Sequence, residues 1–198
     1  MPKLNVLCAA LVLCASTSGH AVVAYNEAVS GDLSGVGTSP TFVALVAGSN
    51  QVLGATGNPG PGTDRDYFSV TVPAGSVLSA LTVLSGTAPL GLAFLGIQAG
   101  SQVTVLPTAG SPAGLLGWTH YAVADVGVNV LPRIGTGVGA SGFSGALPAG
   151  SYAFWIQDFN PGSSTYNLEL TVAAVPETST AAALLLGLGL LAWRGQRR

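Results

Sequence analysis

The amino-acid sequence predicts an all-β fold, an antiparallel β-sandwich or jelly roll, for its central part, residues 22–174. Short segments of this part alternate apolar and polar residues, which is the period of a strand with one buried face. Turns rich in glycine and proline separate these segments, and no stretch of residues 22–174 keeps a helical period. Many short strands joined by such turns are typical of sandwiches and jelly rolls.

An export signal is predicted at the start of the chain, over residues 1–21. Met1–Lys3 supplies a short positive segment, and Leu4–Ala15 is an apolar segment of the length that a signal peptide needs. Gly19 and Ala21 then stand at the −3 and −1 positions of a cleavage site. The mature protein is therefore predicted to begin at Val22.

Both cysteines of the chain, Cys8 and Cys14, lie within this signal. Cleavage after Ala21 leaves a mature protein with neither thiol nor disulfide chemistry. A lipoprotein signal that ends at Cys14 is the alternative, but Leu13 stands where such a signal has a small residue.

Residues 22–174 are long enough for one domain with its own core, and their charge is low. The acidic residues are Glu27, Asp32, Asp64, Asp66, Asp125, Asp158 and Glu169, against Arg65 and Arg133, which gives a net charge of −5. Because no basic patch is present, nucleic acid is not expected as a partner.

Two segments show the strand period most clearly. In Asp66–Val72, residues Phe68, Val70 and Val72 fall on one face, and in Tyr166–Val172 every second residue is apolar. Both are predicted to be strands with one buried face. Further strands are predicted at Ala28–Leu33, Phe42–Ala47, Val52–Ala55, Val77–Leu84, Leu92–Gln98, Gly117–Val123, Val126–Leu131 and Ser151–Asp158.

Turn sequences separate the predicted strands. Val72–Ser76 and Leu147–Ser151 both contain Pro-Ala-Gly-Ser, with a proline suited to the second position of a turn and a glycine free to take a positive φ. Asn58–Gly62 and Asn160–Ser163 are predicted to be surface loops for the same reason.

The segments Asp64–Ser76, Leu147–Tyr152 and Ser164–Leu170 together resemble the bacterial pre-peptidase C-terminal domain. The resemblance leaves Leu92–Gly145 unaccounted for. It implies a β-sandwich of the kind that accompanies secreted enzymes or binds surfaces and polymers.

The last part of the chain, residues 175–198, consists of three blocks with different chemistry. Val175-Pro176-Glu177 comes first, and Pro176, which has no N–H, favours an extended backbone there. An apolar helix is predicted over residues 180–193, shorter than the roughly 17 to 25 residues of a full membrane crossing. The basic tail, residues 194–198, keeps the end of the chain cytoplasmic through Arg194, Arg197 and Arg198.

This order of blocks resembles the PEP-CTERM sorting signal of Gram-negative bacteria, which a membrane enzyme called exosortase processes. The usual motif is Val-Pro-Glu-Pro, and Thr178 takes the place of the second proline. The resemblance implies export through an inner-membrane intermediate to the cell envelope, the outer surface or the extracellular polysaccharide matrix of a biofilm. An apolar helix packed against the domain is the alternative.

Two acidic loops are the best candidate for a ligand site. Asp64 and Asp66 in one loop, with Asp158 and Asn160 in another, offer the oxygen ligands that Ca²⁺ prefers, provided that the loops meet at one end of the sandwich. The alternative is that Asp64 and Asp158 only organise Asx-turns.

Aromatic side chains are candidates for stacking against sugar rings, because an exposed ring offers a flat apolar face. Trp118 and Trp155 are the principal candidates, together with Tyr121 and Tyr152. The alternative places these side chains in the core.

The sequence favours a non-catalytic exported protein that binds polysaccharide or another surface polymer. The alternative is a secreted hydrolase, or the accessory binding domain of one. After signal cleavage His120 is the only histidine, and a triad would need Asp125 and a serine beside it, yet no Gly-x-Ser-x-Gly motif is present. The carboxylates are also too scattered to assign as a glycosidase pair.

Overall fold

The computed structural model describes residues 21–58, 60 and 62–175. Residues 1–20 of the predicted signal peptide lie outside the described residues, as does the apolar helix predicted over 180–193. The same holds for the sorting residues Pro176, Glu177, Arg194, Arg197 and Arg198. Within the described ranges, none of the helices has the length and apolar character that a membrane crossing requires.

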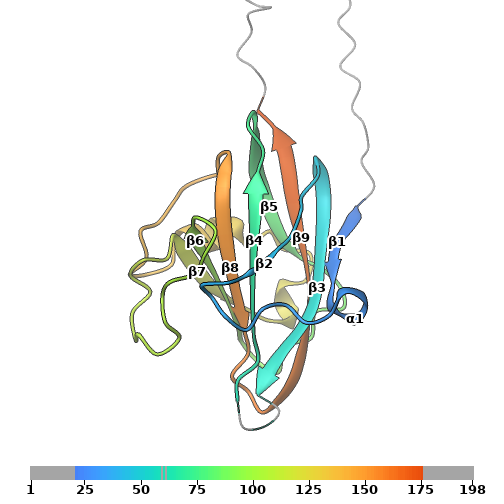
Figure 1. Ribbon diagram of the computed structural model, residues 1–198, viewed down its shortest axis with the longest axis vertical. Coiled ribbons are helices and arrows are strands. Elements are labelled where there is room, and N and C mark those ends of the chain that lie inside the picture. Colours follow the sequence, from blue (N-terminus) through green and yellow to red (C-terminus); the bar gives the residue numbers. More distant parts are fainter. Residues whose placement is uncertain (1–20, 59, 61, 176–198) are drawn as a thin grey trace, which may run out of the picture.

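The described chain folds into two β-sheets with few helical residues, so the all-β prediction is confirmed (Figure 1). The first sheet has the strand order β1-β3-β9-β5, and the second has the order β2-β4-β8-β6-β7. The strands are β1 (Val22–Asn26), β2 (Thr41–Phe42), β3 (Gly48–Asn58), β4 (Arg65–Val72), β5 (Ser76–Val83), β6 (Ala93–Ala99), β7 (Gly117–Tyr121), β8 (Gly150–Gln157) and β9 (Gly162–Ala174). The helices are α1 (Glu27–Ser30), the 3₁₀ helix η1 (Val123–Asp125) and α2 (Leu131–Gly135).

Strand directions are antiparallel inside both sheets and parallel at one edge of each. β3 and β5 pair with β9, and β4 and β6 pair with β8, all in the antiparallel sense. β1 pairs with β3 and β2 pairs with β4 in parallel. The parallel pairs arise because the first four strands alternate between the two sheets, so the chain returns to each sheet in its earlier direction.

The core lies between the sheets. Phe68 of β4 stacks on Phe154 of β8 with ring centroids 4.7 Å apart, and Leu81 and Leu170 of the first sheet belong to the same fully buried cluster. Each such side chain contributes roughly 1.5 to 3 kcal/mol through burial. The apolar alternation predicted for Tyr166–Val172 is confirmed in β9, where every second residue is buried.

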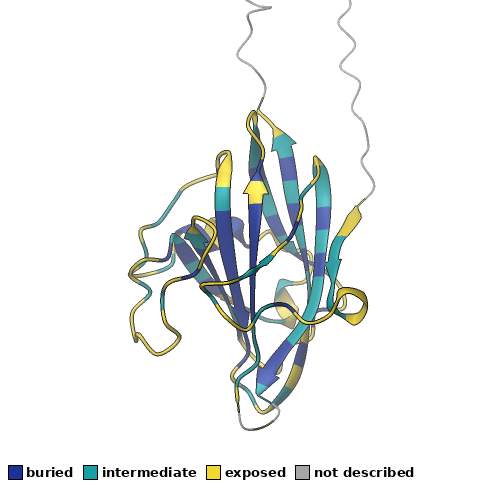
Figure 2. Ribbon diagram, viewed as in Figure 1, coloured by how far each residue is buried: buried dark blue, intermediate teal, exposed yellow. Residues whose placement is uncertain are grey.

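β4 and β8 are buried on both faces over much of their length, whereas one buried face was predicted for Asp66–Val72 (Figure 2). Tyr67 of β4 and Trp155 of β8 point away from the core yet are 2% and 5% exposed. They form a second apolar cluster with Val103 and Leu115. These last two residues belong to the long connection between β6 and β7, which covers the outer face of the sheet.

The strand predicted at Ala28–Leu33 is wrong. The side chain of Asn26 accepts a hydrogen bond from the Ala28 N–H and caps helix α1, and Gly31 with φ of 89° ends that helix. The strand before it, Val22–Asn26, was not predicted, because five residues are too few to show a clear period.

The strand predicted at Phe42–Ala47 is also wrong beyond its first residue. The side chain of Asn50 accepts a hydrogen bond from the Val46 N–H and donates to the carbonyls of Val46 and Gly48. These bonds close a tight loop before β3, and the pairing of the segment with β4 ends at Val43, whose N–H donates to the Ser69 carbonyl at 2.8 Å.

The segment predicted as a strand at Val126–Leu131 begins with a turn and ends in a helix. Only its middle pairs like a strand, where Asn129 bridges to Thr82 of β5 and the Val130 N–H donates to the Leu81 carbonyl. Gly127 has φ of 86°, and the Val128 N–H donates to the Asp125 carbonyl, which reverses the chain. Pro132 then lies in the first turn of α2, where its missing N–H costs no helical hydrogen bond.

Candidate functional site

A row of aromatic side chains crosses the outer face of the second sheet. Trp155 of β8 lies opposite Tyr67 of β4 on one side and opposite Gly96 of β6 on the other, and Gly96 lies opposite Trp118 of β7. Directly opposed residues point to the same face of a sheet, so the three aromatic side chains share this face. The ring centroids of Tyr67 and Trp155 are 5.7 Å apart.

The ring of Phe94 lies over Gly96, which has no side chain of its own. A Cβ at Gly96 would come within 2.9 Å of Phe94 Cε1. The Phe94 ring centroid lies 4.8 Å from that of Trp155 and 5.9 Å from that of Trp118, and the planes of Phe94 and Trp118 are 20° apart. Four rings from four adjacent strands therefore form one apolar surface.

The connection between β6 and β7 turns this surface into one wall of a groove of about 430 Å³. We call it the aromatic groove. Its lining is Phe94, Val105, Leu106, Pro107, Gly110, Ser111, Pro112, Leu115, Trp118, His120, Trp155, Gln157 and Phe159. Most of these residues are apolar, and Gln157, His120 and Ser111 add polar groups, an arrangement typical of small-molecule sites.

Of the aromatic candidates from the sequence, Trp118 and Trp155 both line the aromatic groove. Their indole N–H groups donate to the Val138 carbonyl and to Gln157 Oε1, which holds the rings in place. Trp118 is half-buried, so its ring is the more accessible of the two.

Tyr121 and Tyr152 do not join the groove but belong to the buried core between the sheets. Sequence reasoning missed Phe94. The alternation within Leu92–Gln98 would have placed its side chain on the face of the sheet that points away from the core residue Leu95. Its position in the groove follows from the sheet register, which the local sequence does not state.

Asp158 forms an Asx-turn. This is the alternative that the sequence offered to a calcium-binding role for Asp158. Its Oδ1 accepts from the N–H and the side-chain amide of Asn160, and its Oδ2 accepts from the Leu90 N–H and the Ser164 hydroxyl. Burial of Asp158 raises the pKa of its carboxyl, but these hydrogen bonds outweigh burial and lower the pKa overall.

Asp64 and Asp66 have different surroundings from Asp158 and Asn160. The backbone of Asp64 bridges to Gly57, with the Asp64 N–H donating to the Gly57 carbonyl at 2.7 Å. Asp66 points between the sheets, where its Oδ2 accepts from the Tyr166 hydroxyl at 2.7 Å. The structure thus joins Asn160 to Asp158 and directs Asp66 toward other partners.

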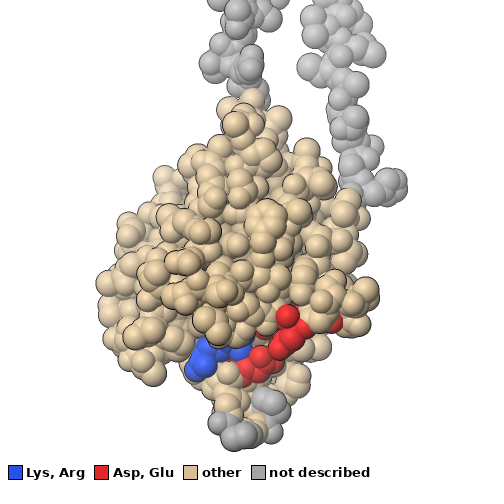
Figure 3. All heavy atoms as spheres, viewed as in Figure 1, with Lys and Arg blue, Asp and Glu red and all other residues tan. Residues whose placement is uncertain are grey.

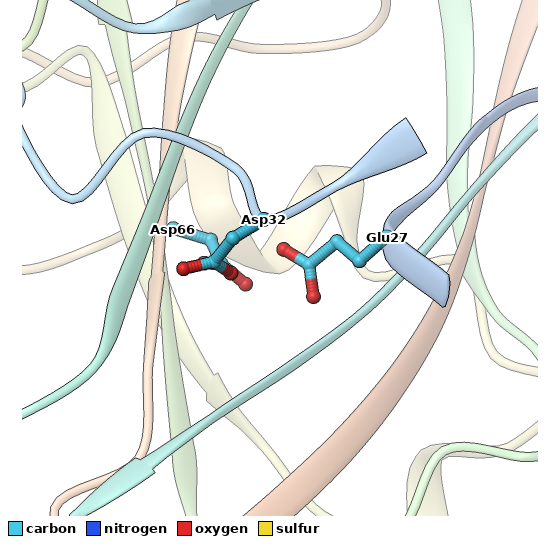
Figure 4. A group of neighbouring side chains, drawn as sticks. All are labelled: Glu27, Asp32 and Asp66. Atoms are coloured by element: carbon cyan, nitrogen blue, oxygen red, sulfur yellow. The ribbon is translucent and has the colours of Figure 1, made fainter. Parts of the chain in front are cut away.

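Glu27, Asp32 and Asp66 bring their carboxylate oxygens within 4.8 Å of one another, and we call them the acidic cluster (Figure 4). Figure 3 shows the acidic side chains of this face gathered in one patch next to a basic group, with little other charge in view. Sequence reasoning did not single out Glu27 or Asp32. The sequence does offer one indication of these two residues. Residues 22–174 contain only seven acidic side chains, so each of them is a candidate for a functional role.

The acidic cluster has perturbed pKa values. Burial raises the pKa of Asp66 to about 9, the Tyr166 hydrogen bond opposes that rise, and the charges of Glu27 and Asp32 add to it. Burial also raises the pKa of Glu27, although hydrogen bonds from the Leu33 and Ala55 N–H groups oppose the change. Such shifts mark candidate functional sites.

The residues considered for a catalytic triad have other contacts. Asp125 accepts hydrogen bonds from the Arg133 guanidinium at 2.9 Å and from the Ala122 N–H at 2.8 Å. The hydrogen bond from Arg133 holds the pKa of Asp125 below its usual value. His120 is exposed, and its ring meets the Trp118 ring edge-on with centroids 5.3 Å apart.

No family model, no curated protein and no solved structure matches this chain. The function is therefore inferred from the sequence and from the two sites described above.

Proposed function

We propose that the chain is an exported, non-catalytic protein of the cell envelope or extracellular matrix of a Gram-negative bacterium. Exosortase processes its tail, and the aromatic groove binds polysaccharide or another surface polymer. The aromatic groove is the observation that carries the binding proposal.

The chemistry of the groove matches a carbohydrate chain. A sugar ring has an apolar face of C–H groups, which packs on aromatic rings such as Phe94 and Trp118, and hydroxyl groups around its edge, which need polar partners such as Gln157 and His120. The described residues that line the groove include no Asp, Glu, Lys or Arg, which favours an uncharged polymer.

The end of the described chain supports the sorting proposal. The Val175 N–H donates to the Gly75 carbonyl at 2.8 Å, directly after β9. Pro176 follows and has no N–H with which to extend this pairing. The proposed sorting motif therefore begins at Val175, directly after β9 and at the end of the described domain.

The fold also fits this role. Two sheets with one core between them correspond to the sandwich or jelly roll that the resemblance to pre-peptidase C-terminal domains implies. We propose that the described domain is a sandwich of this kind and that it binds a surface or polymer.

Binding is tested by titrating the exported protein with a panel of neutral and acidic polysaccharides in calorimetry or affinity electrophoresis. Phe94→Ala and Trp118→Ala each remove one ring of the groove and should weaken binding of a neutral polymer about tenfold or more. Phe42→Ala is the matched control, because Phe42 is 62% exposed on β2 and lies outside the groove lining.

Two results would contradict this proposal. The first is equal binding by the parent and both groove variants, which would place the ligand elsewhere. The second is hydrolysis of a polysaccharide that Asp66→Asn or Asp158→Asn abolishes, which would favour the secreted hydrolase.

A further inference from the structure

The acidic cluster places three carboxyl groups together, and among the described residues no arginine forms a salt bridge with any of them. In the described residues, the two arginines are engaged elsewhere: Arg133 pairs with Asp125, and Arg65 donates to Gln157 and to the Thr63 carbonyl. Like charges at this separation repel, so the cluster requires either bound protons or a bound cation.

One carboxylate oxygen of Asp66 has no hydrogen-bond partner. The side chain of Asp66 is completely buried, and its Oδ2 accepts a hydrogen bond from the Tyr166 hydroxyl. Its Oδ1 is buried with no hydrogen-bond partner. Buried polar atoms in proteins are almost always paired, and an unpaired one commonly marks an ion or water. Figure 4 shows the carboxylates of Asp66 and Asp32 side by side, with Glu27 pointing toward them.

The other members of the cluster are held in position for a shared ligand. Glu27 Oε1 accepts from the Leu33 N–H at 3.0 Å and Oε2 accepts from the Ala55 N–H at 2.7 Å. A carboxylate oxygen has two lone pairs, so each keeps one for another contact. Such outer hydrogen bonds orient the ligands of metal sites.

The cluster is open to solvent on one side. Asp32 is exposed, and Glu27, Asp32 and Tyr166 line a hollow of about 600 Å³ at the surface. A cation can therefore enter and keep part of its hydration shell.

We propose that Glu27, Asp32 and Asp66 bind one Ca²⁺ ion. Carboxylate oxygens are the ligands of hard cations, and the cluster contains no histidine or cysteine to favour zinc or copper. Ca²⁺ takes about six to eight oxygens, which three carboxylates and water from the hollow can supply.

Because Glu27 follows β1 of the first sheet and Asp66 belongs to β4 of the second, the ion joins the two sheets. This site replaces the one predicted at Asp64, Asp66, Asp158 and Asn160 and keeps only Asp66 from it.

The test compares melting temperatures of the exported protein in EDTA and in saturating CaCl₂, together with calorimetric titration of Ca²⁺. The parent should bind one ion and melt roughly 5 to 10 °C higher at a hundredfold excess over Kd, because the ion binds only the folded state. Asp32→Asn and Asp66→Asn should remove both the heat of binding and this rise. Asp32→Asn changes an exposed residue and keeps the test valid if Asp66→Asn does not fold.

Glu169→Gln is the matched control, since Glu169 is an acidic residue of β9 outside the cluster, and it should keep the full calcium response. Equal melting temperatures of the parent in EDTA and Ca²⁺, without heat of binding, would overturn the proposal. A calcium response that Asp158→Asn removes and Asp32→Asn leaves intact would also overturn it.

Discussion

Two completely buried aspartates, Asp66 and Asp158, have pKa values that are shifted in opposite directions. Asp158 accepts four hydrogen bonds, and its pKa is lowered. Asp66 accepts one from Tyr166 and has two acidic neighbours, and burial raises its pKa to about 9. Asp158 is therefore ionised at neutral pH, whereas Asp66 holds a proton unless a cation takes its place.

Asp158→Asn should lower the free energy of unfolding by about 2 to 3 kcal/mol at pH 7, because hydrogen bonds to a charged acceptor are lost. The pKa of Asp158 is below its ordinary value of 3.8 in the folded protein, so its ionised form stabilises the fold above pH 3.8. This contribution disappears as the pH falls through the lowered pKa. Urea unfolding of parent and variant from pH 7 down to about pH 3 should show the difference shrinking with acid.

Glu169→Gln serves as the control here too, with an expected change within about 0.5 kcal/mol at pH 7. A loss of stability in Asp158→Asn that stays constant down to the acid limit would mean that the charge of Asp158 has no part in it.

At the scale of elements, the β3–β9 pair forms the centre of the first sheet. It runs in register from Gly48 opposite Val172 to Asn58 opposite Gly162. Near its end the strands approach so closely that a Cβ at Gly57 would overlap the backbone carbonyl of Gly162. A backbone atom cannot rotate away as a side chain can, so this pairing depends on glycine at position 57.

Gly57→Ala should destabilise the protein by about 1 to 3 kcal/mol, because β9 must shift to make room. Thermal melting measures the effect. Gly60→Ala is the matched control, since a Cβ at Gly60 meets no atom within 4 Å, and it should melt close to the parent. Similar melting temperatures for the two variants would show that the strands are more loosely paired than described here.

At the scale of the whole molecule, both ends of the described domain lie in its upper half in Figure 1. In Figure 1, β9 ends at the top of the domain and β1 begins lower, on the right, while the chain between β6 and β7 lies on the left flank. If the tail is anchored as proposed, the end of β9 faces the membrane and the aromatic groove stays accessible from the side. Sorting and polymer binding then use separate surfaces.

Changing Arg194, Arg197 and Arg198 together to Ser should send full-length, unprocessed protein into the medium. In the proposed sorting signal the arginines provide the charge that stops translocation, and a short apolar segment without that charge would pass through the membrane. Intact-mass analysis of the medium and membrane fractions shows whether the tail has been cleaved. The same masses give the mature N-terminus, which is expected at Val22.

Pro176→Ala combined with Glu177→Ala should have a different effect. The helix still inserts, but the processing enzyme loses its extended, charged recognition segment, so full-length protein should accumulate in the inner membrane. Export and cleavage of both tail variants at the level of the parent would refute the sorting proposal and leave the tail as an anchor or a packed helix.

The sequence by itself determined the all-β class and the strands that carry a clear period. β9 matches its prediction because one of its faces packs against the core and the other is more exposed. Its residues therefore alternate between apolar and polar. Val126–Leu131 pairs with β5 only around Asn129, because Gly127 imposes a turn before it and Pro132 favours a helix start after it. The proposed export and sorting signals also rest on the sequence alone, because such signals depend on contiguous residues.

Only the tertiary structure decided which distant residues share a site. Glu27 begins helix α1, Asp32 lies in the loop after that helix, and Asp66 belongs to β4. Phe94 reaches Trp118 through the pairing of β6 with β7. Both arrangements depend on strand order and register, which arise from the packing of the whole core. A short stretch of sequence records whether a side chain is buried, but not which side chain from another strand it meets.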